Sequence, residues 1–253
     1  MSTADASDPP AGFSGDYASW AEASAQCTDY VPEYEDKVRA ATLSVLLGYA
    51  PHTRDGVVFP KVEYSWPLLA GLMYCAAAAG PRLSVLDFGG SLGVTYLQNR
   101  RFLDRLPTVA WHIVERDGYV EFGRNAIQHE RIRFHRSVEE CLAIDQPDVL
   151  LLSCVLQSLP DPYGFLETML ALPFRHLLID RLPLNAEPRD RLTIFRTYPS
   201  IIANMSRPWW FFDEQRLLSA IAETFEMVET FDGFESANIP SRYAGYVFSR
   251  RAG

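Results

Sequence analysis

Apolar residues follow two different spacings along the chain, and the change falls near residue 81. Before it, helical spacing predicts a short helix around Trp20 and longer helices over 34–47 and 66–79, with no strand. Residues 1–12 are rich in Ser, Ala, Asp and Pro, which is typical of a flexible tail. Residues 1–80 therefore predict a flexible tail and a helical N-terminal extension, which we expect to act as a lid.

After residue 80, short apolar runs alternate with segments of helix length, as in parallel strands joined by crossover helices. The run over 148–153 is apolar almost throughout, which indicates a strand covered on both faces. Residues 81–253 thus predict an α/β domain with a Rossmann-like, mostly parallel sheet of seven strands, an antiparallel last strand and helices on both faces. An aromatic insertion is expected near 185–212. The predicted strands span 83–88, 109–114, 131–135, 148–153, 175–180, 226–231 and 243–249.

The composition narrows the choice of partner and compartment. The 253 residues include 32 acidic and 23 basic side chains, a formal charge of -9, without a basic cluster, so no nucleic-acid partner is expected. The four cysteines are far apart and the five histidines form no His-Glu-x-x-His motif, so we expect no metal and a reducing compartment. Neither a signal peptide nor a membrane-spanning run is found, which predicts a cytoplasmic protein without a membrane partner.

The stretch LSVLDFGGSLG, residues 83–93, carries the strongest functional signal. A predicted strand ends in an acid, and a cluster of glycines follows before a helical pattern begins. A strand, a tight glycine turn and a helix N-terminus, in this order, build a site for a nucleotide-type ligand. The dinucleotide pattern G-x-G-x-x-G is absent, whereas acid-x-Gly-x-x-x-Gly is present. The residues expected at this site are Asp87, Gly89, Gly90, Ser91 and Gly93.

A second acid narrows the ligand. Glu115 ends the next predicted strand, 22 positions beyond Gly93, where a carboxylate accepts hydrogen bonds from both hydroxyls of a ribose. The acid on the first strand, Asp87, suits a cationic ligand better than a pyrophosphate. S-adenosylmethionine (SAM) carries an ammonium and a sulfonium group as well as a ribose, so it is the expected cofactor.

Three segments resemble motifs of class I SAM-dependent methyltransferases, over roughly residues 81–249. VLDFGGSLG is similar to the first motif of that superfamily, IVERD to the second, and DVLLLSCVLQSLPDP to the fourth. The opening FSGDYASWAEA, together with Asp-Phe-Gly-Gly-x-Leu-Gly, resembles a subgroup of bacterial methyltransferases of unassigned substrate, a likeness that covers nearly the whole chain.

The resemblance implies a set of cofactor contacts. The glycine turn would line the methionine and ribose part of SAM, and Glu115 would hold the ribose hydroxyls. Two features depart from the family: Ser91 replaces a middle glycine, and no clear acid follows the third strand. The other positions implied at the cofactor are Arg116, Ser137 and Val138 near the adenine, and Ser153 and Cys154 at the end of the fourth strand.

Asp180 is the candidate catalytic residue. It ends the fifth predicted strand, at the ligand edge of the sheet, where it can take a proton from an incoming hydroxyl or amine. Two alternatives stay open, a structural ion pair with Arg181 or Arg189, and catalysis by positioning alone. His176 begins the same strand, so it should face the opposite edge and be structural.

Aromatic residues gather before the core and after the fifth strand, where aromatic walls suit an apolar or sugar-like acceptor. Tyr30 belongs to the first group, whereas Phe211 and Phe212 are expected to be structural core. Arg196 and Arg207 lie in the same insertion as candidates for an anionic acceptor or as solvated surface residues. The candidate substrate contacts are Tyr17, Trp20, Tyr198 and Trp209.

The sequence therefore predicts a SAM-dependent methyltransferase that transfers a methyl group to oxygen or nitrogen of a small molecule, such as a natural product or a sugar-like acceptor. Two alternatives stay open, a binding or scaffold protein with the same fold and no catalysis, and an NAD-linked oxidoreductase. The missing G-x-G-x-x-G and the early Asp87 count against the oxidoreductase. A homodimer is the expected assembly if the chain does not act alone.

Overall fold

The computed structural model describes residues 11–28, 31–198, 201–202 and 205–252. The tail predicted over 1–12 lies almost entirely outside the described residues, and so does Tyr30.

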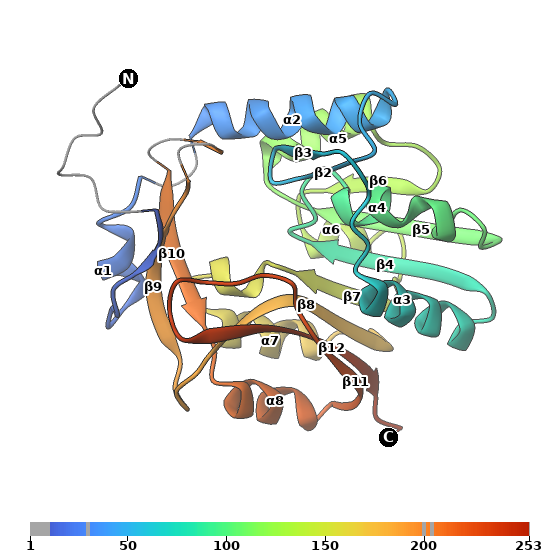
Figure 1. Ribbon diagram of the computed structural model, residues 1–253. Coiled ribbons are helices and arrows are strands. Elements are labelled where there is room, and N and C mark those ends of the chain that lie inside the picture. The colour runs from blue at the N-terminus through green and yellow to red at the C-terminus, as the bar shows by residue number, and fades with distance from the viewer. Residues whose placement is uncertain (1–10, 29–30, 199–200, 203–204, 253) are drawn as a thin grey trace.

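The centre of the molecule is a seven-stranded sheet with the order β11-β12-β8-β7-β4-β5-β6 (Figure 1). Neighbouring strands from β8 to β6 are parallel, and β12 pairs antiparallel with both β8 and β11. The predicted fold class, including the antiparallel last strand, is therefore confirmed. The strands are β4 (Arg82–Phe88), β5 (Thr108–Val114), β6 (Ile132–His135), β7 (Val149–Ser153), β8 (His176–Asn185), β11 (Phe225–Asp232) and β12 (Ser241–Arg250).

Helices cover both faces of this sheet. Side chains of α3, α4 and α5 pack with Val85 and Leu151 in one hydrophobic cluster. Those of α6, α7 and α8 pack with Leu86 and Leu150 in another. Successive residues of one strand thus point to opposite cores, as the pleat requires, which explains why these strands are apolar throughout. The helices are α3 (Trp66–Ala78), α4 (Val94–Leu103), α5 (Asp117–Ala126), α6 (Val138–Leu142), α7 (Pro162–Leu170) and α8 (Glu214–Ala222), with a 3-10 turn η1 (Leu156–Ser158).

The prediction that the first 80 residues contain no strand is wrong. Besides the helices α1 (Trp20–Ser24) and α2 (Pro32–Leu46), this segment contains β1 (Gly12–Ser14) and a hairpin of β2 (His52–Arg54) and β3 (Val57–Phe59). Each strand has three residues, too few to show a period of two. The hairpin turn, Asp55-Gly56, has φ angles of 52° and 76°, the left-handed pair that an Asp-Gly turn adopts between strands.

The aromatic insertion also contains unpredicted strands. After β8, which extends five residues beyond Asp180, the chain forms β9 (Arg191–Arg196) and β10 (Ser206–Phe211). They join β1 in a small antiparallel sheet with the order β1-β9-β10. The insertion and the N-terminal extension therefore build one sheet together, and the proposed domain boundary at residue 80 stays a prediction.

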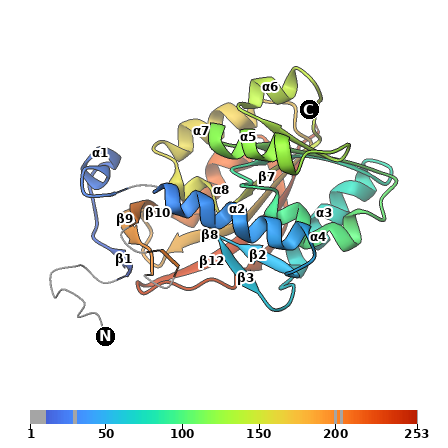
Figure 2. The same cartoon turned by 90° about the horizontal axis from the view of Figure 1, so that it is seen from above.

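The small sheet stands beside the ends toward which β4 and β7 point, and α2 crosses above that region (Figure 1). Seen from above, α2 runs between the small sheet and the helices of the α/β domain (Figure 2). The carboxyl ends of the central strands therefore point toward the N-terminal extension and the insertion. Within the described part of the chain, we find no helix with the length and apolar character to cross a membrane.

Candidate functional site

The glycine turn after β4 has a backbone that side chains rarely permit. Gly89 has φ +70°, Ser91 φ +52° and Gly93 φ +79°, and Gly93 is the residue just before α4. A Cβ on Gly89 would lie 2.5 Å from Cγ2 of Val155, so glycine is required there for space as well as for conformation. The Gly89 amide donates to the carbonyl of Val114 at 2.9 Å, which fixes the turn against the end of β5.

Glu115 lies beside the turn, as the sequence predicts. Its carboxylate accepts from the Ser91 amide at 3.2 Å through Oε1 and from the Arg116 amide at 2.8 Å through Oε2. Burial raises the pKa of Glu115, and the two amide donors partly oppose that rise. A carboxylate has about four acceptor positions. Because the side chain is 12% exposed, Glu115 still presents acceptor capacity at the mouth of the turn.

Asp87 packs beneath the turn. The carboxylate accepts from Nε1 of Trp111 at 3.0 Å through Oδ2, while Oδ1 is buried and has no partner among the described residues. A Cβ on Gly90 would lie 2.5 Å from this carboxylate, so the second glycine closes the turn over the acid. Burial raises the pKa of Asp87 to about 7, against the opposing donor Trp111. A cationic group at this edge would stabilise the ionised form.

Asp180 is buried at the equivalent edge of β8. Its Oδ2 accepts from the Ser153 hydroxyl at 3.0 Å and lies 3.7 Å from Nε of Arg181, and its carbonyl accepts from the Cys154 amide at 2.9 Å. Burial raises the pKa of Asp180, and both Arg181 and the Ser153 hydroxyl oppose that rise. The end of β7 and the middle of β8 are thus connected through the candidate base. The predicted alternative with Arg181 is present, whereas Arg189 pairs with Asp16 and Glu187 instead.

Backbone strain is concentrated at this edge. Within the described ranges, four residues other than glycine have positive φ, namely Asp55, Ser91, Cys154 and Arg181. Ser91 and Cys154 follow the adjacent strands β4 and β7, and Arg181 lies in the next strand, β8, beside the end of β7. Such conformations cost of order 1 to 3 kcal/mol each and cluster at ligand sites. Here they also coincide with the switch point of the sheet, where β4 has β5 on one side and β7 on the other.

Residues from several other elements complete the site, and of these the sequence indicated only Arg181. Nη1 of Arg54 lies 3.4 Å from Oε1 of Glu235, and Nε of Arg181 lies 4.0 Å from the same oxygen. Tyr34, from α2, donates to Oδ1 of Asp55 at 3.5 Å. Burial raises the pKa of the Tyr34 phenol, so it stays protonated. These groups come from α2, the β2–β3 hairpin, β8 and the β11–β12 loop, and the one available signal was the Asp55-Gly56 turn.

The helix α2 is tied to the cofactor side of the site. Oε1 of Glu35 lies 3.5 Å from Nη2 of Arg116, and Nη2 of Arg39 donates to the carbonyl of Gly118 at 3.3 Å. Arg116 also lies over the ring of Tyr119 at 5.2 Å. Arg116 thus connects α2 to the start of α5, next to Glu115.

The residues after β6 lie at the same edge. The Ser137 hydroxyl accepts from the Glu140 amide at 3.1 Å and caps α6, so this hydroxyl has a structural role. Val138 is buried behind it.

The aromatic residues predicted to contact the substrate lie in different parts of the structure. Tyr17 and Trp20 pack on one side of the small sheet with Ala23, and Trp20 stacks on Trp210 with ring centroids 6.5 Å apart. Trp209 packs in a separate cluster that also includes Cys154, which brings it to the end of β7. Tyr198 is 50% exposed.

The three residues expected to be structural lie as predicted. Phe211 and Phe212 are fully buried. His176 is buried at the start of β8, opposite the candidate site, where its Nδ1 lies 3.1 Å from the Ser249 hydroxyl.

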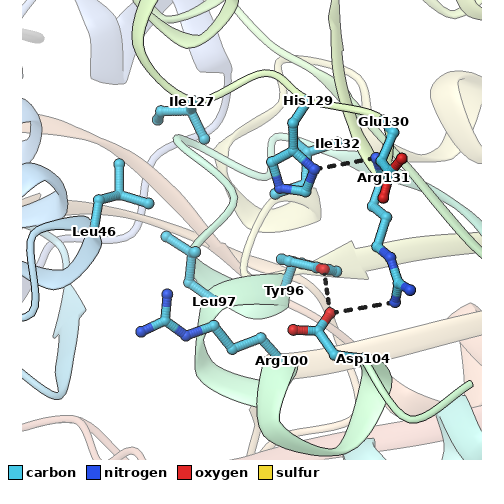
Figure 3. A pocket seen from close by; sticks show the side chains of 10 residues that line it. All are labelled: Leu46, Tyr96, Leu97, Arg100, Asp104, Ile127, His129, Glu130, Arg131 and Ile132. Atoms are coloured by element: carbon cyan, nitrogen blue, oxygen red, sulfur yellow. Dashed lines mark hydrogen bonds and ion pairs between the residues drawn. The ribbon is translucent and has the colours of Figure 1, made fainter.

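A separate cavity of about 380 Å³ is bordered by α4 and by the segment that leads into β6 (Figure 3). There the Tyr96 hydroxyl donates to Asp104 at 2.6 Å, and Nη1 of Arg131 lies 3.5 Å from the same carboxylate. None of the predicted site residues lines it.

Comparisons with known proteins give the fold. No family profile and no curated protein matches the sequence. Among solved structures, the N-terminal domain of EvdMO1, crystallised in the presence of S-adenosylhomocysteine (SAH) and D-fucose, aligns over 88% of this chain and 99% of its own, with 15% identity and a TM-score of 0.54. A SAM-dependent methyltransferase from Methanosarcina mazei aligns over 73% of this chain and 97% of its own, with 11% identity and a TM-score of 0.51. The chain thus has the Rossmann-like fold of class I SAM-dependent methyltransferases.

Proposed function

We propose that the protein is a SAM-dependent methyltransferase acting on oxygen or nitrogen of a small molecule. One observation carries the proposal: the Ser91 amide of the glycine turn donates to Glu115, which brings the turn and the ribose-binding candidate together at the switch point of the sheet. The EvdMO1 domain, which has this fold, was crystallised with SAH, and this supports the same cofactor here.

The residues at the edge fit such a cofactor. Glu115 would accept from the ribose hydroxyls, and the glycines at 89 and 93 allow the backbone to approach the ligand closely. Arg116, Ser137 and Val138 would border the adenine. When bound, SAM supplies a methyl group activated by a sulfonium. The buried carboxylates Asp87 on β4 and Asp180 on β8 would supply negative charge to that group when ionised.

Transfer of an activated methyl group depends mainly on alignment and on the exclusion of water. We assign the exclusion of water to α2, which lies over this edge and is tied to α5 through Arg39 and Arg116. In this role α2 would be the lid that the sequence predicts within the N-terminal extension. Ser153 and Arg181 hold the Asp180 carboxylate, so it can accept a proton from the acceptor as the new bond forms.

The acceptor would lie between β7, β8 and the loops. Arg54, Arg181 and Glu235 offer charged donors and acceptors, and Trp209 offers an aromatic wall near Cys154. This mixture suits a polar acceptor that bears hydroxyl or amino groups, such as a sugar-like molecule. Tyr17, Trp20 and Tyr198 stay predictions as acceptor contacts.

We expect Asp180→Asn to reduce kcat by ~10²- to 10⁴-fold, the usual contribution of a general base. Because burial raises the pKa of Asp180, the wild-type rate should fall as the pH drops through that raised value, and the variant should lack this fall. Methyl-labelled SAM with a panel of hydroxyl- and amine-bearing sugars would provide the assay, and SAM affinity would be the control. If the variant keeps full turnover across pH, Asp180 is not a general base and positioning alone accounts for catalysis.

Calorimetry tests the proposed function directly. The protein should bind SAM and SAH, and it should not bind NADH. NADH binding without SAM binding would overturn the proposal in favour of the oxidoreductase. SAM binding without methyl transfer to any member of the acceptor panel would favour the non-catalytic alternative.

We further propose a cytoplasmic location and a role in small-molecule biosynthesis. The four cysteines are far apart along the sequence, which fits a reducing compartment. The formal charge of -9 counts against a nucleic-acid partner. A homodimer stays a prediction.

A further inference from the structure

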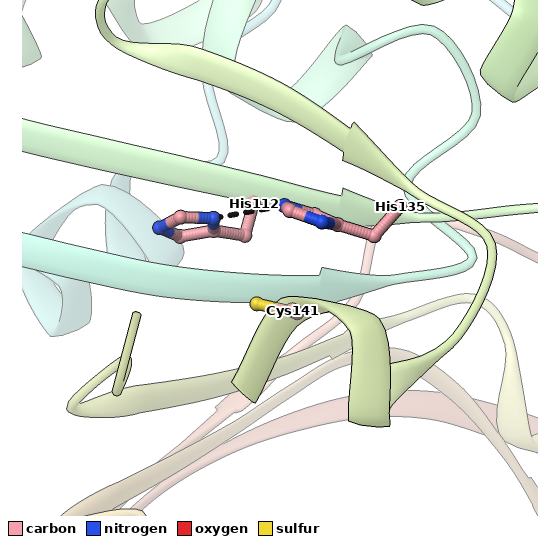
Figure 4. A group of neighbouring side chains, drawn as sticks. All are labelled: His112, His135 and Cys141. Atoms are coloured by element: carbon pink, nitrogen blue, oxygen red, sulfur yellow. Dashed lines mark hydrogen bonds between the residues drawn. The ribbon is translucent and has the colours of Figure 1, made fainter. Parts of the chain in front are cut away.

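Two histidines and a cysteine meet on the face of the sheet that α6 covers, and none of the three is assigned to the proposed active site. His112 comes from β5, His135 from the end of β6 and Cys141 from α6 (Figure 4). All three are buried, and one ligand atom from each lies within 4.8 Å of the other two. The sequence predicts no metal because these residues are far apart along the chain. The parallel pairing of β5 and β6 brings them together.

The contacts of His112 resemble the second shell of a metal site. Its Nε2 lies 3.0 Å from Oδ2 of Asp145, and its Nδ1 lies 3.0 Å from Nε2 of His135. A carboxylate accepts only, so the ring proton of His112 is on Nε2 and Nδ1 presents a lone pair toward the cluster. A metal-binding histidine usually donates its other N–H to a carboxylate in this way.

The cluster is not fully satisfied by its own hydrogen bonds. Nδ1 of His135 is buried and has no partner among the described residues. The ring atom of His135 that faces His112 is Nε2, so Nε2 and not Nδ1 would bind the ion.

We propose that His112, His135 and Cys141 bind a zinc ion and that Asp145 orients His112. Two imidazoles and one thiolate match the ligand preference of Zn²⁺. Zn–N bonds of ~2.0 to 2.1 Å in a tetrahedral site place two nitrogens about 3.3 Å apart, close to the 3.0 Å between the two rings. The Cys141 sulfur lies within 4.8 Å of the ligand nitrogens. One thiolate and the Asp145 carboxylate balance the charge of the ion.

Such an ion would stabilise the fold near the cofactor edge. It would connect β5, β6 and α6, and α6 begins at Val138, next to the residues assigned to the adenine. Its ligands are distinct from those of the proposed methyl-transfer site, so the inference stands or fails independently of the proposed function.

Cobalt and zinc titrations of the full chain test the site. Wild-type protein should bind one Co²⁺ with a thiolate-to-metal absorption band, and one Zn²⁺ should displace it. Cys141→Ser should lose the band and weaken Zn²⁺ binding at least about 100-fold. The matched control is Cys75→Ser, which alters another buried cysteine outside the cluster and should keep both.

A second variant protects the test against misfolding of Cys141→Ser. The Asp145 side chain is 42% exposed, so Asp145→Asn should fold, and loss of the orienting carboxylate should weaken Zn²⁺ binding by ~10- to 100-fold. Absence of the thiolate band in wild-type protein at millimolar Co²⁺ would overturn the proposal. Equal Zn²⁺ affinity of wild-type protein and folded Cys141→Ser would overturn it as well.

Discussion

Replacement of Gly89 by alanine is expected to weaken SAM binding at least about 100-fold while the sheet remains folded. The new Cβ would lie 2.5 Å from Cγ2 and 3.1 Å from Cβ of Val155, which packs on the turn. Overpacking of this kind costs ~1 to 3 kcal/mol, and a left-handed residue with a side chain costs ~1 to 2 kcal/mol more. The turn relieves both costs by moving, and this displaces the amide of Ser91 from Glu115. Calorimetry with SAM and thermal unfolding measure the two effects.

Gly80 provides the matched control. It also has a positive φ, +73°, but no described heavy atom lies within 4 Å of the place where its Cβ would be. Gly80→Ala should therefore lower the melting temperature slightly through conformational strain alone and leave SAM affinity unchanged. If Gly89→Ala binds SAM as the wild type does, the turn does not approach the cofactor. If both variants lose binding equally, general destabilisation explains the loss.

The central sheet was predictable because its strands are long and lie between two cores. Val85 and Leu86, adjacent in β4, pack in different clusters, so the whole strand must be apolar. The helix starts were predictable for a local reason, since Asp213 accepts from the amides of Gln215 and Arg216 at the start of α8. Each of these signals depends on residues that are close together in the sequence.

The small sheet was not predictable because its pairing is long-range. Phe13 pairs with Phe195 across most of the chain, and strands as short as β1 have too few positions to show a period. Part of the candidate site was not predictable for the same reason, because it depends on long-range contacts. Arg54 and Glu235 come from a hairpin and a loop that meet only in the folded chain. Sequence spacing placed Glu115 beside the turn because a strand and a helix of ordinary length separate them.

The burial and direction of individual side chains also could not be predicted from the sequence. Asp87 was expected to line the site of a cationic ligand, and its carboxyl group packs beneath Gly90 and against Trp111. Ser137 was expected at the adenine, and its hydroxyl caps α6. In both cases the residue lies at the predicted edge of the sheet. The direction of its side chain is decided by neighbours from other elements.

Glu115→Gln is expected to weaken SAM binding tenfold or more, and Glu115→Ala is expected to weaken it further. Hydrogen bonds to a charged group contribute ~1.5 to 3 kcal/mol, and 1.4 kcal/mol corresponds to a factor of ten. Glutamine keeps one carbonyl oxygen for the Ser91 amide, so the turn should hold its shape while the ribose loses a charged acceptor. Alanine removes both, and the Ser91 and Arg116 amides lose their acceptor.

The two variants together separate the ribose contact from the support of the turn. Asp117→Asn is the control because Asp117 is an acid at the start of α5, two residues from Glu115, with its side chain 83% exposed and paired only with Arg136 among the described ion pairs. It should bind SAM with wild-type affinity. Calorimetric affinities, with circular dichroism to verify folding, decide among the outcomes. Unchanged affinity in a folded Glu115→Gln would remove Glu115 from the ribose site. A loss confined to Glu115→Ala would mean that Glu115 acts by holding Ser91 in its left-handed conformation.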